Sequence, residues 1–411
     1  MMLSHRTRKS VTESSISVFP STAIEARSPL QLNRLIGDYY SRLFEADAKE
    51  TQYPLLYERL IEDGTDGVLE KFRDYAKQRR EVLEELRSKV SLQTASYDEG
   101  GEASKRVVGV DAGRNGTDYR FAYVPLYGAV ALLVEGWRVT GEPLCASCKP
   151  EVWPAEKDPK RRESLLHMAL EFYVARRSVE LWSPDYLLFD GGLILNPVLH
   201  PRTDDSGDYK RDFAFAVISA IDFLEACRRF GVSLVGFVKR TKMSHLYRVL
   251  GLPPTRDTAL LSPIMRTGEY TEPFPMRNLV VRSYESFSTG FSGGGELARV
   301  YTSYIKTGST TPFRIEVPSY CVRDLGRIAS VLFTMADPSG VPYPVHEADR
   351  YTRITRPTAN MYALVLFAKA LDLVKKGDLD SSDLDMLALQ YGEPWSLKED
   401  DYLTDLAAKR E

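Results

Sequence analysis

Two patterns of hydrophobic and polar positions divide the chain. From about residue 30 to 95, apolar residues recur three and four apart among many charges, as in LQLNRLIGDYYSRLF, which is typical of amphipathic helices. From residue 106 onward the apolar residues gather in short runs instead, as in RVVGVDAG, DYLLFDGG and VSLVGFVKR. Short apolar runs bounded by glycine predict buried strands.

Helices are predicted between these strands. Amphipathic patterns cover 160–182, 211–230 and 357–376, and the segments RNLVVRSYESF, ELARVYTSYIKT and PFRIEVPSY are strand-like. The early strands are adjacent in sequence and are expected to pair antiparallel, whereas the later strands alternate with helices. The chain is therefore predicted to be an α/β protein with a mixed sheet flanked by helices.

Composition divides the chain into four parts. Residues 1–28 are Ser/Thr-rich and weakly apolar, which predicts a disordered tail. Residues 29–100 form a helical N-terminal segment that ends in a small, acidic, glycine-bearing linker. The main α/β domain is expected over 101–376, and an acidic, peripheral tail over 377–411.

The bulk composition restricts the function classes. The 411 residues are 43% hydrophobic and carry a formal net charge of -3, which argues against a surface coated in positive charge for bulk nucleic-acid binding. A local basic groove is still compatible with this net charge. A partner is then expected to deliver any polyanionic substrate. No apolar run reaches membrane-spanning length and the start lacks an apolar signal region, so we expect a cytoplasmic protein without a membrane segment.

The four cysteines are too few for a disulfide scaffold. Cys145 and Cys148 form a single CxxC, which is only half of a tetrahedral zinc site. We therefore expect neither a structural zinc nor a redox role for this pair.

Two aspartates follow apolar strands in the same way. Asp111 ends RVVGVD and Asp190 ends DYLLFD, and glycine follows closely in both places. Ligand sites of open α/β sheets lie at the carboxyl ends of strands, and two aspartates held there can bind a divalent cation. The alternative is that each Asp-Gly simply begins a turn.

Further carboxylates are candidates for the same site. Glu171 lies at the edge of the apolar stripe of the predicted helix 160–182, whereas Glu163 points nearly the opposite way and is the weaker candidate. Asp349 lies at the start of a helix expected near His346, where acidic residues also favour the helix dipole. A solvated position on the flank of the helix is the alternative for Glu171.

A family resemblance follows from the order and spacing of the motifs. The order is a strand with DAG, a helix with glutamate, LLFDGGL, GVSLVGFVKRTKMSHL, RIEVPSY and GVPYPVHEADRYTRI. Over about residues 105–375 this order resembles the NurA nuclease family. The resemblance implies an RNase H-like core with helical N-terminal and C-terminal additions.

The resemblance also implies roles for individual residues. Asp111 and Asp190 match the two metal-binding aspartates of the family, and Glu171 matches the glutamate on the helix between them, with Glu163 as the fallback. Lys239 and Arg240 match a basic pair that ends a central strand and is suited to gripping phosphate.

Near its end the chain departs from the family pattern. Family members often read G-Y-P-x-P-x-x-E-A-H, and here the Tyr place is Val341 and the His place is Asp349. An aspartate still binds a hard cation, so Asp349 remains a metal-ligand candidate. Tyr343 and His346 lie close by and are candidates for substrate binding in place of the missing side chains.

The function implied by the resemblance is that of a divalent-metal-dependent DNA nuclease. Mn²⁺ or Mg²⁺ would be held by four carboxylates, namely Asp111, Glu171, Asp190 and Asp349. The resemblance implies single-strand endonuclease and 5'-3' exonuclease activity in DNA end processing. It also implies a homodimer that works with a HerA-like hexameric ATPase.

Two other functions compete with this interpretation. The altered positions Val341 and Asp349 are compatible with a catalytically weakened adaptor that docks on the ATPase. The segment DAGRNGT at 111–117 also resembles the phosphate-binding turn of actin-like and sugar-kinase-type ATP-binding proteins, although a second such turn is poorly represented by FDGG.

Overall fold

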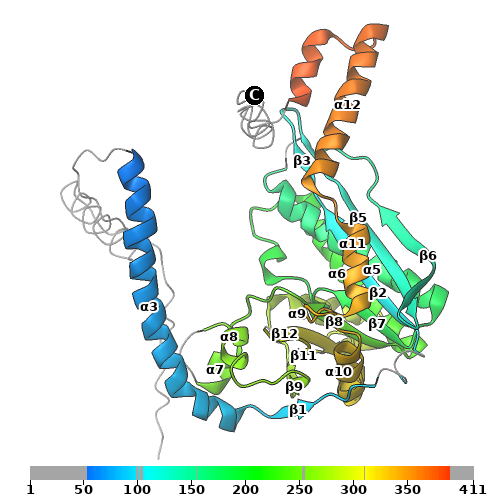
Figure 1. The fold of residues 1–411 in the computed structure, drawn as a ribbon. Coiled ribbons are helices and arrows are strands. Elements are labelled where there is room, and N and C mark those ends of the chain that lie inside the picture. The colour runs from blue at the N-terminus through cyan, green and yellow to red at the C-terminus, as the bar shows by residue number, and fades with distance from the viewer. Residues whose placement is uncertain are drawn as a thin grey trace, which may run out of the picture. The chain divides into compact units, whose positions relative to one another are not determined.

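The computed structural model describes residues 53–98, 101, 105–154, 156–251, 255–309 and 311–388 (Figure 1). The chain forms two compact units, Met1–Gln78 and Arg79–Glu411. In the first unit the described residues form the beginning of helix α3 (Tyr53–Lys89), whose remaining residues belong to the second unit. The predicted tail 1–28 and the segment 389–411 lie outside the described residues.

The second unit is built on one large mixed sheet, in the strand order β1-β9-β11-β12-β8-β7-β2-β5-β6, with β10 paired to β11. Strands β2, β7 and β8 run parallel, and the neighbours on either side of them pair antiparallel. A small separate sheet joins β3 (Thr117–Asp118) and β4 (Tyr123–Val124). The strands of the large sheet are β1 (Leu92–Thr94), β2 (Val107–Arg114), β5 (Tyr127–Glu135), β6 (Arg138–Ser147), β7 (Tyr186–Asp190), β8 (Ser233–Val238), β9 (Glu269–Thr271), β10 (Phe274–Pro275), β11 (Val300–Ile305) and β12 (Phe313–Pro318).

Helices cover both faces of this sheet (Figure 1). The helices that follow α3 are α5 (Pro159–Trp182), α6 (Gly207–Phe230), α7 (Leu246–Leu250), α8 (Asp257–Leu261), α9 (Leu279–Ser288), α10 (Leu325–Thr334), α11 (Tyr343–Thr352) and α12 (Arg356–Lys376), with 3-10 turns at η1 (Pro197–Leu199), η2 (Gly294–Glu296), η3 (Ser319–Asp324) and η4 (Ser381–Leu387). Helix α12 projects beyond the sheet (Figure 1). The predicted α/β fold with a mixed, helix-flanked sheet is confirmed.

The main hydrophobic core lies between the sheet and the pair α5 and α6. Phe172 of α5, Phe189 of β7 and Phe223 of α6 pack ring against ring, with centroids 5.0 to 6.0 Å apart. All three rings are fully buried, so removing one leaves a cavity. This packing fixes α5 against the strands β2 and β7.

On the opposite face, helix α11 lies directly on strand β2 because two glycines of the strand carry no side chain. A Cβ added to Gly109 would lie 2.0 Å from the carbonyl oxygen of Pro344, and one added to Gly113 would lie 1.8 Å from that of Thr352. Alternate residues of a strand point to the same face, so Asp111, between the two glycines, faces α11 as well. The glycines therefore bring the helix down onto the aspartate.

One predicted strand is wrong. The segment RNLVVRSYESF forms helix α9, not a strand. Its side chains Val280, Tyr284 and Ser288 are buried at four-residue spacing, and the Asn278 side chain accepts hydrogen bonds from the first helical amides. The β-branched residues Val280 and Val281 favour a strand, but this cap and the burial of one helical face override that preference.

Two further points concern the domain division. Residues 92–94, inside the predicted helical segment 29–100, form strand β1, which pairs with β9 at the edge of the sheet. The boundaries placed near residues 28, 100 and 376 stay predictions.

In the part of the chain that is described, no helix is both long and apolar enough to cross a bilayer.

Candidate active site

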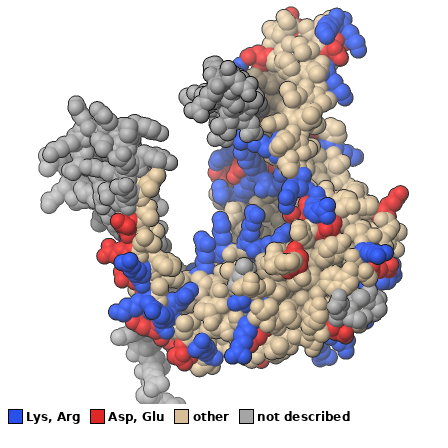
Figure 2. Space-filling view, viewed as in Figure 1, with Lys and Arg blue, Asp and Glu red and all other residues tan. Residues whose placement is uncertain are grey.

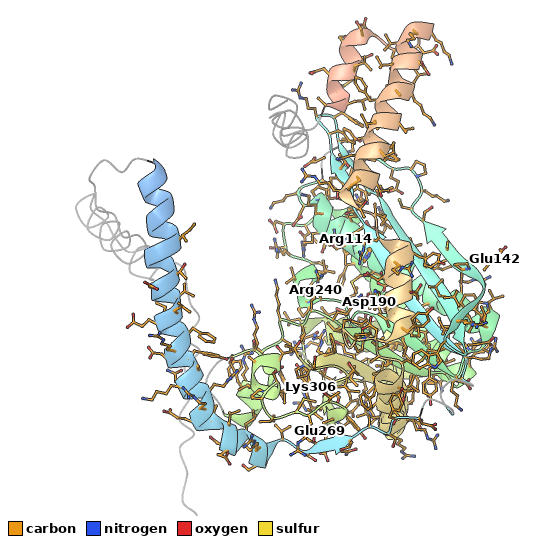
Figure 3. The ribbon with its side chains drawn as sticks, in the orientation of Figure 1. Arg114, Glu142, Asp190, Arg240, Glu269 and Lys306 are labelled. Carbon is orange, nitrogen blue, oxygen red and sulfur yellow. The ribbon has the colours of Figure 1, made fainter. Side chains whose placement is uncertain are left out.

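Three aspartates from distant parts of the sequence meet where helix α11 lies on the central strands β2 and β7. Asp111, Asp190 and Asp349 each present a carboxylate oxygen, and these oxygens all lie within 4.8 Å of one another. Asp111 lies in β2 and Asp190 ends the parallel neighbour β7, while Asp349 comes from α11, which contacts both strands. Figure 3 shows Asp190 beside α11 and near Arg240. The proximity predicted for Asp111 and Asp190 is therefore observed.

Glu171 of helix α5 lies near this cluster. Its side chain is 3% exposed, and among the described residues its Oε1 has no hydrogen-bond partner. Burial raises the pKa of Glu171 well above its usual range, and the charges of Asp111 and Asp190 raise it further. A buried carboxylate oxygen without a partner is unfavourable unless a proton or a cation satisfies it.

The crowding of carboxylates changes their protonation. Burial, followed by the charge of Asp111, raises the pKa of Asp190 to about 8, although the Lys239 ammonium opposes the shift. Burial also raises the pKa of Asp111, against the hydrogen bond from Thr352 and the charge of Lys239. The cluster therefore favours protons, or a cation in their place, at neutral pH.

A pH dependence of stability follows for the metal-free protein. The pKa of Asp190 is about 8 when folded and 3.8 for the ordinary side chain, so between these values the folded chain holds a proton that the unfolded chain has lost. The free energy of unfolding is expected to fall as pH rises through this window, by up to ~1.4 kcal/mol per pH unit for one such group. Urea unfolding in EDTA at pH 6 and pH 8 measures this slope.

The matched variant for this slope is Asp190→Asn, which cannot ionise. The variant is expected to lose less stability than the parent between pH 6 and pH 8. Equal slopes for parent and variant would show that Asp190 ionises normally.

Lys239 directly follows β8, and its ammonium lies among the carboxylates. The Nζ atom is 2.5 Å from Oδ2 of Asp190 and 3.3 Å from Oδ1 of Asp349. Asp349 is also paired with Arg353, at 2.7 Å. Burial alone would raise the pKa of Asp349, but the hydrogen bond from Arg353 and the charge of Lys239 lower it. The carboxylates thus already surround one cation, which fits a site that binds positive charge.

A cavity of about 520 Å³, which we call the central cavity, opens beside these acids. It is lined by Asp190, Gly191, Val238, Lys239, Arg240, Ser339, Val341, His346, Asp349 and Arg353. Lys and Arg side chains gather on the face of this unit that carries Arg114 and Arg240 (Figures 2 and 3). The central cavity therefore lies between the aspartate cluster and a basic surface.

The predicted substrate-binding residues divide into two groups. Lys239, Arg240 and His346 line the central cavity, whereas Tyr343 is not among its lining residues. The Tyr343 ring instead packs on Trp137, with centroids 6.4 Å apart. We therefore keep three of these four residues as candidates for phosphate contact.

The fallback Glu163 has a different role. Its carboxylate is 1% exposed and accepts hydrogen bonds from the Tyr123 hydroxyl and the Leu126 amide, both at 3.0 Å, and pairs with Arg114 at 3.2 Å. These contacts use the carboxylate within the fold. Glu171 is therefore the better candidate on α5 for a site carboxylate.

Two polar residues of the site were not predicted from the sequence. The Thr352 hydroxyl donates a hydrogen bond to Oδ2 of Asp111, and Oδ2 of Asp337 lies 2.6 Å from Nδ1 of His346. Thr352 lies three residues after Asp349 on the same helix, and this spacing places both on one face. The spacing was a usable signal for Thr352, but none in the sequence pointed to Asp337.

Comparisons with known proteins agree with this geometry. The NurA domain model matches residues 105–354. The fold is similar to that of the NurA nuclease from Sulfolobus solfataricus, with a TM-score of 0.59, 15% identity, and coverage of 79% of this chain and 99% of that one. A second NurA crystal structure matches with a TM-score of 0.51, 11% identity, and coverage of 78% and 99%.

A NurA structure bound to dAMP and manganese matches with a TM-score of 0.49, 12% identity, and coverage of 73% and 94%. No curated protein matches the chain. The structural similarities show a shared fold, which agrees with the RNase H-like core that was predicted. Because the domain match spans more than half of its residues, the chain belongs to the NurA family of nucleases.

Proposed function

We propose that the chain is a divalent-metal-dependent DNA nuclease whose active site is the central cavity with its neighbouring acids. The observation that carries the proposal is the convergence of Asp111, Asp190 and Asp349 within 4.8 Å, together with the buried Glu171, whose Oε1 has no hydrogen-bond partner among the described residues. Like charges at this distance repel, and a divalent cation removes that cost.

Mn²⁺ or Mg²⁺ is the expected cofactor because every proposed donor is a carboxylate oxygen. Asp111, Glu171, Asp190 and Asp349 would hold it, and when bound it would activate a water and stabilise the leaving oxygen of a phosphodiester. Thr352 holds the carboxylate of Asp111 in place. Lys239 and Arg240 would contact phosphate oxygens without reading the base sequence.

The test is DNA degradation by the full chain. With Mn²⁺ we expect cleavage of single-stranded DNA, and EDTA should stop it. Nicking of circular single strands reports the proposed endonuclease activity, and early release of short products from a 5'-labelled linear strand reports the 5'-3' exonuclease activity. A chain that leaves every substrate intact with both Mn²⁺ and Mg²⁺ is not a nuclease.

Within this proposal the chain acts in DNA end processing with a HerA-like hexameric ATPase. The formal net charge of -3 supports a partner that delivers the DNA, because the chain as a whole attracts polyanions poorly. Co-purification with such an ATPase, and faster cleavage of duplex ends in its presence, would support the partnership. A chain with the same duplex activity alone and with the ATPase would not.

A homodimer is the proposed assembly, and helix α12 is the proposed contact surface. Six large apolar side chains of this helix are 39 to 66% exposed, namely Met361, Tyr362, Leu364, Val365, Phe367 and Leu373. An apolar surface of this kind on a helix is typical of an interface.

Leu364→Glu is therefore expected to shift the chain from dimer to monomer in sedimentation or light-scattering measurements. The matched control is Val198→Glu, because Val198 is 64% exposed and Leu364 is 66% exposed, and Val198 lies on η1 rather than α12. A parent chain that is monomeric, or a dimer that survives Leu364→Glu, would show that α12 has another role.

An adaptor without nuclease activity is the second candidate. One observation favours it: Asp349 is already engaged by Arg353 at 2.7 Å and by Lys239 at 3.3 Å. If these pairs persist when Mn²⁺ is present, the cluster loses a ligand. The degradation assay separates the two functions, since an adaptor would bind the ATPase and leave DNA intact.

A further inference from the structure

A pair formed by a carboxylate and an imidazole lies beside the central cavity. His346 of α11 is 48% exposed and lines the cavity, and its Nδ1 lies 2.6 Å from Oδ2 of Asp337. Asp337 belongs to the turn before α11, and its side chain is only 17% exposed. This pair has no part in the metal-binding cluster described above.

Asp337 is held rigidly by its own turn. Its Oδ1 accepts hydrogen bonds from the Ser339 amide and hydroxyl, at 2.8 and 2.5 Å, and from the Val341 amide at 3.1 Å. Burial alone would raise the pKa of Asp337, but the hydrogen bonds from Ser339 and His346 lower it. The carboxylate is therefore ionised, and an ionised carboxylate accepts a hydrogen bond from a nitrogen that carries a proton.

This contact determines which nitrogen of His346 is available. With Nδ1–H donating to Asp337, the remaining nitrogen is Nε2, and it has no hydrogen-bond partner among the described residues. A ring oriented in this way by a carboxylate is the arrangement in which histidine transfers protons. His346 also lies three residues before Asp349, so both side chains are on the same face of α11.

The charged groups around His346 come from several elements. Asp190 ends β7, Lys239 and Arg240 follow β8, and Arg353 follows α11, and all four line the same cavity. On the helix itself, Glu347 and Arg350 pair with each other, at 2.9 Å. A phosphodiester held by the basic side chains would therefore lie between the aspartate cluster and the imidazole.

We infer that His346, oriented by Asp337, is a further catalytic residue that donates a proton to the leaving oxygen during phosphodiester cleavage. This inference rests on the proposed nuclease function. A water oxygen forms the new bond to phosphorus, and the bond from phosphorus to the leaving sugar oxygen breaks. That oxygen keeps the electron pair and takes the proton from Nε2. The water proton passes to solvent, and the imidazole later regains its proton from solvent.

The experiment compares leaving atoms. One single-stranded DNA carries ordinary linkages, and two matched strands carry one bridging sulfur at the 3' or the 5' position of the cleaved bond. The products of the parent chain identify which of the two sulfur strands places sulfur at the leaving position. A leaving thiolate needs no proton, so its departure does not depend on a proton donor.

His346→Gln in the full chain with Mn²⁺ is expected to cut ordinary DNA about 10² to 10³-fold more slowly than the parent. With sulfur at the leaving position, the loss is expected to shrink to less than about threefold, because the missing proton transfer is no longer required. Asp337→Asn should show the same pattern with a smaller loss. Mn²⁺ binding by calorimetry and the thermal midpoint should remain close to those of the parent.

The control variant is His200→Gln. His200 contacts the Pro201 carbonyl and the Phe213 ring and is not a lining residue of the cavity. The His200→Gln variant should therefore cut both strands like the parent. Equal losses on oxygen and sulfur strands would mean that the Asp337–His346 pair only fastens α11 to its preceding turn. Absence of any loss would also overturn the inference. A parent chain that cuts neither strand contradicts the proposed function instead.

Discussion

Replacing Asp190 by asparagine is expected to abolish metal-dependent DNA cleavage, with a loss of about 10³-fold or more. Asparagine keeps the shape of the side chain but removes the charge that a divalent cation needs, and a loss of ~4 kcal/mol of transition-state stabilisation is ~10³-fold in rate. Asp111→Asn should behave alike, because the two carboxylates belong to one cluster. Initial rates on single-stranded DNA across a Mn²⁺ titration measure the effect.

The same variants should fold normally. The pKa of Asp190 is raised to about 8, so the folded metal-free chain already prefers the neutral form that asparagine imitates. Asp204→Asn is the matched control, because that carboxylate is 57% exposed and pairs with Lys157 outside the central cavity. If Asp190→Asn and Asp111→Asn cut like the parent with the same Mn²⁺ requirement, the proposed active site is wrong.

Gly113→Ala is expected to damage both stability and activity, although alanine is a small change. The added Cβ would meet the Thr352 carbonyl oxygen at 1.8 Å, and backbone cannot move aside as a flexible side chain can. Helix α11 must therefore shift away from β2, at a cost of roughly 1–3 kcal/mol or more. The shift would break the hydrogen bond from Thr352 to Asp111 and carry Asp349 away from the cluster.

Urea unfolding and Mn²⁺-dependent cleavage measure this prediction. Gly207→Ala is the control, because a Cβ at Gly207 meets nothing within 4 Å and the residue begins helix α6. That control should unfold within about 1 kcal/mol of the parent and cut DNA normally. Gly113→Ala with the stability and Mn²⁺ requirement of the parent would show that the close contact of α11 with β2 does not hold the site together.

Several parts of the site were predictable from the sequence because they depend on local patterns. The apolar runs before Asp111 and Asp190 predict buried strands that end at the acids. Both strands form, and β7 ends at Asp190 as predicted, but β2 continues past Asp111 to Arg114. The three-four spacing along α5 favoured Glu171 over Glu163 as a site residue; Glu163 is bonded within the fold, and the role of Glu171 stays a prediction. Hydrophobic periodicity is set by neighbouring residues, so it is readable without a structure.

Other features depended on how the elements pack in the folded chain. Burial of one helical face decided that the strand-like segment forms α9, and the Tyr343 ring packs on Trp137 and is not among the residues that line the cavity. The pairing of Asp337 with His346 depends on how the turn before α11 folds back on the helix. No local pattern specifies these contacts.

Local patterns in the sequence predict most of the strands and helices, and the acids that lie in or beside them, because these patterns arise from residues close together in the chain. Only the tertiary structure decided which of those acids meet. Asp349 reaches Asp111 because Gly109 and Gly113 leave room for a helix more than two hundred residues later in the chain. The absence of a side chain acquires this meaning only when the distant backbone that occupies the space is known.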